Sequence, residues 1–175
     1  MRDYTGHGWE GEEYDGNLDI KDIAKIVRKE LKKEYPDCKF SIRIERYAGG
    51  CSLNLSLMEA PFEVVGDAPE ECPAGFGPRD FENLKAQIES VRERGYAQLN
   101  HYQLTKRYEE DGICNGTALT PKAWKCVRRA TQIATGYRRD DSDGMIDYFD
   151  TNFYLHLEIG RWDKPFVVKN GKGGK

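Results

Sequence analysis

The chain is short of the side chains and motifs that usually identify an enzyme. It has only three histidines, and its five cysteines include no Cys-x-x-Cys pair, which excludes the common zinc-ribbon and thioredoxin-type motifs. A Gly-x-Ser-x-Gly elbow, a phosphate-binding loop, a His-Glu-x-x-His motif and a dinucleotide fingerprint are all absent. We therefore expect a protein without catalytic residues, metal or cofactor.

Long hydrophobic runs are also missing, as is a basic-then-apolar leader. A membrane-spanning helix needs about 20 apolar residues, and a secretory leader needs an apolar stretch after its basic residues. The 175 residues are 38% hydrophobic and 33% charged, which is typical of a soluble globule of one domain. We expect a cytoplasmic protein that does not contact membranes.

The formal net charge of −3 hides a strong segregation of charge. Residues 1–19 carry six acids against one base, residues 120–139 carry six bases and no acid, and residues 140–150 carry five aspartates. Such local charges decide which partners are plausible more than the average does.

Two segments, residues 39–58 and 147–166, alternate apolar and polar side chains at period two, which predicts strands with one face on a core and the other in solvent. The first contains the turn Tyr47–Gly50 and is expected to form an antiparallel hairpin. Helices are expected after Asp19, near Asp80 and after Thr120, each opening with capping or first-turn residues.

This order of elements predicts an α+β fold, with an antiparallel sheet of about three to five strands and about three helices packed mainly on one face. Residues 1–17 have no helical or strand period and are expected to form a flexible acidic arm. Residues 18–167 are expected to form a single α+β domain, and residues 168–175 a flexible tail of lysine and glycine.

Two constellations could carry chemistry. The run Asp140–Gly144 resembles part of a calcium loop, but Arg139 would occupy a carboxylate position, so the EF-hand is rejected. A solvated acidic loop is favoured over another oxygen-ligand site.

His156, with Glu158 two residues later on the same strand face, could form an acid–base pair. This proximity is automatic on a strand, so a hydrolase or nuclease built on these groups is kept only as a second alternative.

Basic residues on two predicted helices give a stronger indication of function. Their spacing could follow a phosphate backbone, and a tyrosine beside them could stack on bases. The alternative is an ordinary solvated helix face, which the sequence pI near 5.7 supports. The candidate binding residues, for nucleic acid or an acidic partner, are Lys25, Lys29, Lys125, Arg128, Arg129, Tyr137 and Arg138.

The chain resembles the large polyvalent protein-associated domain 29 family. The resemblance rests on residues 22–61 (DIAKIVRKELKKEYPDCKFSIRIERYAGGCSLNLSLMEAP), on YAQLNHY and on the closing DDSDGMIDYFDTNFYLHLEIGRWDKPF, and it spans about residues 18–167. Its parts include Lys39-Phe40-Ser41 and the turn Tyr47–Gly50, where Ala48 departs from the family's tyrosine-glycine-glycine.

The resemblance implies a protein of phages or conjugative elements, expressed or delivered to blunt host defences, and it supplies no catalytic residues. We therefore predict an accessory protein of a bacterial mobile genetic element that acts by binding and counters a host defence system. The expected partner is a host or element-encoded protein. Direct binding of nucleic acid through the basic helix faces is the first alternative.

Overall fold

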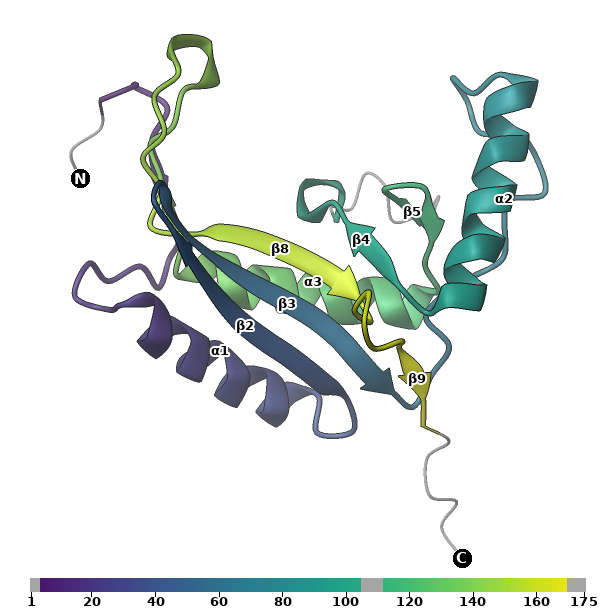
Figure 1. Cartoon of the computed structure of the whole chain (residues 1–175), viewed down its shortest axis with the longest axis horizontal. Helices are drawn as coiled ribbons and strands as arrows, with labels where there is room; N and C mark the ends of the chain where they lie inside the picture. The colour runs from purple at the N-terminus through teal and green to yellow at the C-terminus, as the bar shows by residue number, and fades with distance from the viewer. Residues whose placement is uncertain (1–3, 105–111, 170–175) are drawn as a thin grey trace, which may run out of the picture.

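The computed structural model describes residues 4–104 and 112–169 (Figure 1). Of the tail predicted at residues 168–175, residues 170–175 lie outside this range. The helices and strands follow one another as β1 (Trp9–Glu10), α1 (Ile20–Glu34), β2 (Lys39–Tyr47), β3 (Gly50–Ala60), α2 (Pro78–Arg94), β4 (Ala97–Leu99), η1 (His101–Gln103), β5 (Ile113–Cys114), β6 (Thr117–Ala118), α3 (Pro121–Gly136), β7 (Arg139–Asp140), η3 (Gly144–Ile146), β8 (Tyr154–Ile159) and β9 (Val167–Val168).

The helices begin and end where capping chemistry places them. The Asp19 side chain accepts hydrogen bonds from the first backbone amides of α1, and the Thr120 side chain accepts one from Ala123 at the start of α3. Helix α2 begins at Pro78 and is closed by Gly95, which has a φ of 61°. This left-handed conformation costs glycine little, so Gly95 can end the helix sharply.

The sheet is mixed rather than wholly antiparallel. Its strand order is β2-β3-β8-β4, with β9 also pairing with β3. The β2–β3 hairpin and the β4–β8 pair are antiparallel, as the prediction required, but β8 and β9 run parallel to β3. A tight turn forces antiparallel pairing, whereas the long connection from β3 to β8, which contains α2 and α3, permits a parallel crossover.

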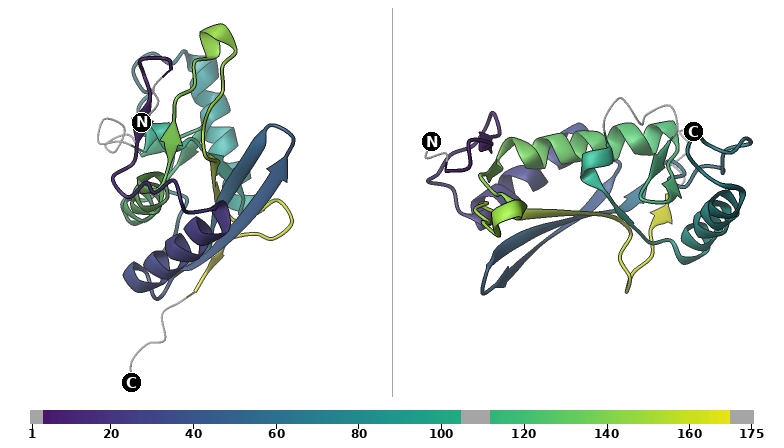
Figure 2. Two further views of the ribbon diagram at one scale, coloured as in Figure 1. Left: turned by 90° about the vertical axis from the view of Figure 1, so that its left-hand side faces the viewer. Right: turned by 90° about the horizontal axis from the view of Figure 1, so that it is seen from above.

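Helices α1 and α3 lie side by side on one face of this sheet (Figures 1 and 2). Their apolar stripes meet the inward side chains of the strands, and Val27, Leu55, Val127 and Phe153 are completely buried there. Helix α2 stands at the end of the sheet, where it packs on β6 through a second, smaller apolar cluster. The α+β class, the three helices and the five-stranded sheet confirm the predicted fold.

The described part of the acidic N-terminal segment contacts the rest of the chain. Strand β1 pairs with β7, and the backbone amides of Gly11 and Glu13 donate to the carbonyls of Arg138 and Gly136. A side chain at Gly11 would place a Cβ 2.2 Å from the Gly136 carbonyl oxygen, so this close approach requires glycine. Within residues 4–104 and 112–169, no helix has both the length and the apolar character needed to cross a membrane.

Candidate functional site

The basic residues predicted as a binding site do not share one environment. Lys25 and Lys29 are exposed on α1, and Lys125 is exposed on α3, where Arg128 is half-buried. The amine of Lys25 lies 3.4 Å from the carboxylate of Asp22 in a solvent-exposed ion pair, which contributes little to stability.

Arg129 makes a two-pronged ion pair with Glu34 of α1. Its Nε and Nη2 atoms donate to the Glu34 carboxylate over 2.9 Å and 2.6 Å. The hydrogen bonds from Arg129 hold the pKa of Glu34 below its usual value, and the same bonds to the Glu34 carboxylate raise the pKa of Arg129. The pair joins α1 to α3 and neutralises one of the predicted cations.

Tyr137 and Arg138 are buried, at 8% and 3% exposure. The Tyr137 hydroxyl donates to Glu30 over 2.9 Å, and burial followed by this hydrogen bond raises the pKa of Tyr137 to about 12. The guanidinium of Arg138 forms an ion pair with Asp140 and donates to the Tyr102 hydroxyl. The ring of Tyr137 is therefore not available for base stacking, because the fold buries it.

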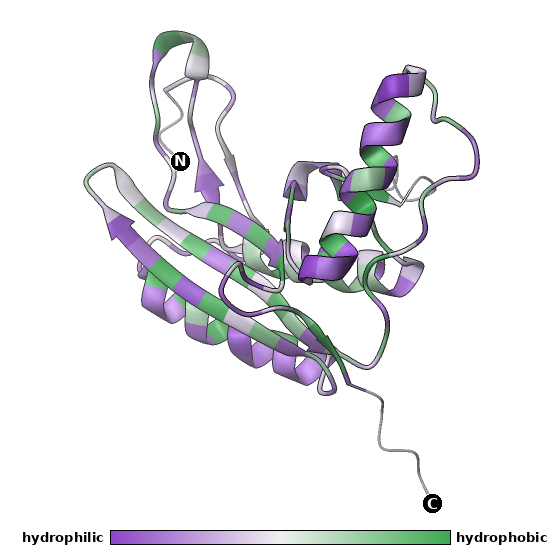
Figure 3. Cartoon of the chain, turned by 45° about the vertical axis from the view of Figure 1, so that its right-hand side comes forward, coloured by the Kyte–Doolittle hydropathy of each residue, from purple (hydrophilic) through white to green (hydrophobic). Residues whose placement is uncertain are grey.

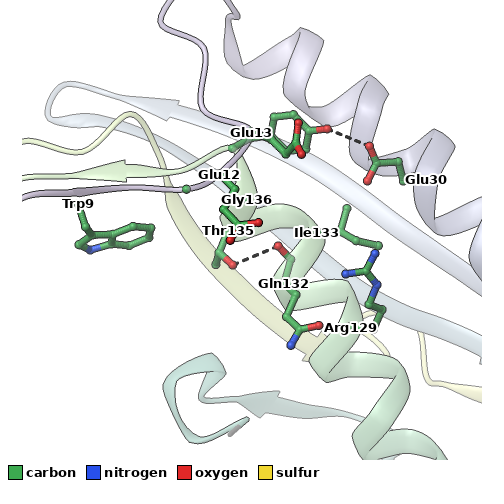
Figure 4. A pocket seen from close by; sticks show the side chains of 11 residues that line it. Trp9, Glu12, Glu13, Glu30, Arg129, Gln132, Ile133, Thr135 and Gly136 are labelled. Carbon is green, nitrogen blue, oxygen red and sulfur yellow. Dashed lines mark hydrogen bonds between the residues drawn. The ribbon is translucent and has the colours of Figure 1, made fainter. Parts of the chain in front are cut away.

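Arg129 and Tyr137 instead line a hollow of about 650 Å³ between the N-terminal segment, α1 and the end of α3 (Figure 4). Acidic side chains outnumber basic ones there, since Glu12, Glu13 and Glu30 face one arginine. The carbonyl end of α3 adds partial negative charge. A phosphate backbone would be repelled at this position, so these two residues do not form a basic nucleic-acid surface together.

His156 and Glu158, the predicted acid–base pair, lie on the face of the sheet that α1 and α3 leave uncovered. The Glu158 carboxylate accepts hydrogen bonds from Ser56 Oγ at 2.9 Å and from the Tyr96 hydroxyl at 3.3 Å. Arg43 lies 3.8 Å away from it. Glu158 is thus held by neighbours other than His156, although both residues line a hollow of about 370 Å³ beside β4.

His101 lines the same hollow and was not predicted as a site residue. Burial, together with the nearby positive charge of Arg138 and the ring of His156, lowers the pKa of His101 to about 4. Its ring is therefore neutral at pH 7. No motif marks His101, because it reaches His156 only through the pairing of β4 with β8.

The aspartate-rich segment forms a projecting hairpin between β7 and β8 (Figure 1). Its stem is closed by backbone hydrogen bonds between Asp143 and Tyr148 and by a double ion pair between Arg139 and Asp150. The buried Asp141 carboxylate accepts from the Tyr4 amide and the Thr5 hydroxyl, both at 2.6 Å. Among the described residues, no group of three or more His, Cys, Asp or Glu side chains is placed to hold a metal ion.

Large apolar side chains are exposed on this hairpin, for which the sequence predicts a solvated acidic loop. Met145 is 92% exposed, Ile146 58% and Phe149 62%. We call these three residues the apolar tip. In Figure 3 the end of this hairpin is coloured partly as hydrophobic. Exposed apolar residues grouped on one projection are uncommon on the surface of a monomeric globular protein.

An aromatic hollow of about 740 Å³ lies between this hairpin and the β2–β3 hairpin. Tyr47 at the end of β2 and Tyr154 at the start of β8, on either side of β3, have ring centroids 6.5 Å apart. We use the name aromatic hollow for the space lined by Tyr47, Gly49, Asp147, Tyr148, Phe149, Tyr154 and His156.

Comparison with protein families supports the resemblance over part of its predicted extent. The sequence model of the family described as large polyvalent protein associated domain 29 matches residues 18–96, which contain α1, the β2–β3 hairpin and α2. The closing segment 140–166 lies beyond this match. The match suggests a protein associated with phages or other mobile elements. Neither the curated proteins nor the solved structures contain a match to the chain.

Proposed function

We propose that this chain, whose residues 18–96 match that domain family, is a cytoplasmic accessory protein of a bacterial phage or conjugative element that acts by binding a partner protein. The partner we propose is a host or element-encoded component of defence or replication. Binding, rather than catalysis, is the mode of action that the described surface supports best.

The observation that carries this proposal is the exposed apolar tip on a braced hairpin. Burying apolar side chains at an interface contributes about 25 cal/mol per Å² of surface removed from water. The stem of the hairpin is held by backbone hydrogen bonds, and yet these apolar side chains remain exposed to solvent. A rigid projection also loses little conformational entropy when it docks.

The environment of the basic residues is the reason to favour a protein partner over nucleic acid. Arg129 is paired with Glu34, Arg138 is paired with Asp140, and Tyr137 is buried. Lys25, Lys29 and Lys125 remain exposed. The test below therefore also distinguishes a protein partner from direct binding of nucleic acid.

The test is an affinity pull-down from a bacterial lysate, with and without nuclease, using the wild-type chain and the double variant M145S/I146S. We expect a captured protein that resists nuclease and is lost with the variant, because serine removes the apolar contact area. The variant W162S is the matched control: Trp162 is 78% exposed on the turn after β8, and its loss should leave capture unchanged.

Two results would contradict the proposal. Capture that persists with M145S/I146S would show that the apolar tip is not the contact. Capture that disappears with nuclease, and falls when Lys25 and Arg128 are replaced by glutamate, would identify nucleic acid as the partner, with the steep salt dependence that phosphate contacts produce.

A further inference from the structure

The aromatic hollow has the composition of a site for a positively charged group. Four of its lining residues are aromatic phenyl or phenol rings, Tyr47, Tyr148, Phe149 and Tyr154, and one is the acid Asp147. The faces of such rings carry partial negative charge and attract ammonium and guanidinium groups within about 6 Å. No lysine or arginine is among the described residues that line it.

Asp147 differs from the other aspartates of the hairpin in the contacts of its carboxylate. Asp140 and Asp150 are paired with Arg138 and Arg139, and Asp143 accepts a hydrogen bond from the Met145 amide. For Asp147, by contrast, the described residues supply no hydrogen bond or ion pair. An exposed carboxylate at the rim of an aromatic hollow is complementary to a cation.

The backbone also holds Asp147 in an uncommon conformation. Its φ is 53°, in the left-handed region, which aspartate tolerates better than most side chains but glycine or asparagine would fill as readily. This residue ends the short helix η3 and turns the chain back toward Tyr148. The turn therefore places a carboxylate where a neutral residue would suffice for folding.

The walls of the hollow are fixed by separate parts of the fold. Tyr47 belongs to the end of β2 and Tyr154 to the start of β8, and both strands pair with β3. The Tyr148 hydroxyl hydrogen-bonds Asp150, and its ring lies 4.8 Å from that of Tyr4. A ligand would thus meet rings that are already in position, which lowers the entropy cost of binding.

We propose that the aromatic hollow binds a cationic side chain, an arginine or a lysine, presented by the partner protein. This inference rests on the proposed function and specifies its chemistry: the apolar tip supplies the hydrophobic contact, and the hollow beside it selects a partner with a basic residue. The guanidinium of arginine is the better fit, because its plane can stack on a tyrosine ring while its N–H groups donate to Asp147.

The probe is N-acetyl-arginine amide, titrated against the full chain while the ring signals of Tyr47 and Tyr154 are followed by NMR. N-acetyl-citrulline amide has nearly the same shape without the charge and is the matched ligand control. We expect saturable shifts with the arginine probe and binding weaker by about tenfold or more with citrulline. The corresponding lysine and acetyl-lysine probes distinguish guanidinium from ammonium selectivity.

Substitutions of residues that line the aromatic hollow test whether the arginine probe binds there. Asp147→Asn and Tyr47→Ala should each weaken the arginine probe several-fold, whereas Tyr102→Ala, which removes a tyrosine 66% exposed elsewhere, should not. Both altered side chains are exposed, so the variants are expected to fold, which circular dichroism checks. Equal binding of arginine and citrulline, or unchanged binding by Asp147→Asn and Tyr47→Ala, would overturn the proposal.

The outcome is separable from that of the proposed function. The pull-down test alters Met145 and Ile146, neither of which lines the hollow. If capture is lost with M145S/I146S but arginine does not bind, the partner-binding function stands and the cationic site is wrong. If arginine binds but capture persists with M145S/I146S, the site stands and the apolar tip is not the contact.

Discussion

The two faces of strand β3 are equally buried but chemically opposite. Toward α1 and α3 the strand presents Leu53, Leu55 and Leu57, each with no exposed surface. Toward the uncovered face of the sheet it presents Ser52, Asn54 and Ser56, at 1%, 7% and 0% exposure. Burial alone therefore does not identify the core of this protein.

The polar face shared by β3 and β2 includes two buried polar atoms without partners. Asn54 Oδ1 and the Nε of Arg43, its register partner on β2, are buried without a hydrogen bond. Such atoms are uncommon in folded proteins, and each costs about 1–3 kcal/mol. One face of the strand thus supplies stability, while the other carries polar groups that contribute little to it.

The largest effect is expected from a cavity on the apolar face. Leu55→Ala should lower the free energy of unfolding by about 3–4 kcal/mol, because the surrounding helices cannot collapse fully into the space. Urea denaturation followed by circular dichroism measures the change.

Asn54→Ala, at the adjacent and similarly buried position, is the matched control. Its Oδ1 has no partner to lose, so we expect a change within about 1 kcal/mol of zero. Equal losses for the two variants would contradict the distinction between the faces.

A second effect concerns pH and the uncovered face. The pKa of His101 is lowered from 6.5 to about 4, so the unfolded chain binds a proton more readily than the folded one. Stability from the neutral ring is complete above pH 6.5 and is lost as the pH falls toward 4. Between pH 7 and 4, wild type should lose about 1–2 kcal/mol more than His101→Gln, allowing for the part of the ring that water reaches.

Thermal unfolding across this pH range, in wild type and His101→Gln, measures the difference. Parallel curves for wild type and His101→Gln would show that His101 is not held neutral by the fold.

The smallest effect is expected where the polar face is satisfied. Glu158→Gln replaces a carboxylate that accepts from Ser56 and Tyr96, and the amide can accept only one of these bonds well. We expect a loss of about 1 kcal/mol. Glu45→Gln, an exposed glutamate on β2, should change stability by less than about 0.5 kcal/mol, and a larger loss there would mean that net charge is responsible.

Local signals in the sequence predicted the helices and the hairpin well. The stripe Ile20, Ile23, Ala24, Val27 and Leu31 is buried as expected, because a period of 3.6 residues defines a face without reference to the rest of the chain. The same holds for the inward leucines of β3. The expectation that the polar residues of β3 face solvent was wrong, because β3 is an inner strand and the longer side chains of β2 and β8 shield its serines and Asn54.

Functional surfaces were less predictable than elements. The basic residues were chosen from helical spacing, which cannot show that Arg129 would meet Glu34, some 95 residues earlier in the chain. The aromatic hollow was missed because Tyr47, Phe149 and Tyr154 come from two distant segments.

By itself, the sequence determined the three helices, the β2–β3 hairpin, strand β8 and the uneven distribution of charge, since these depend on neighbours a few residues apart. Tertiary structure alone decided that β8 runs parallel to β3, that Tyr137 and Arg138 are buried, and that an apolar tip stands beside an aromatic hollow. Those features depend on contacts between residues far apart in the chain, and local sequence patterns do not specify such contacts.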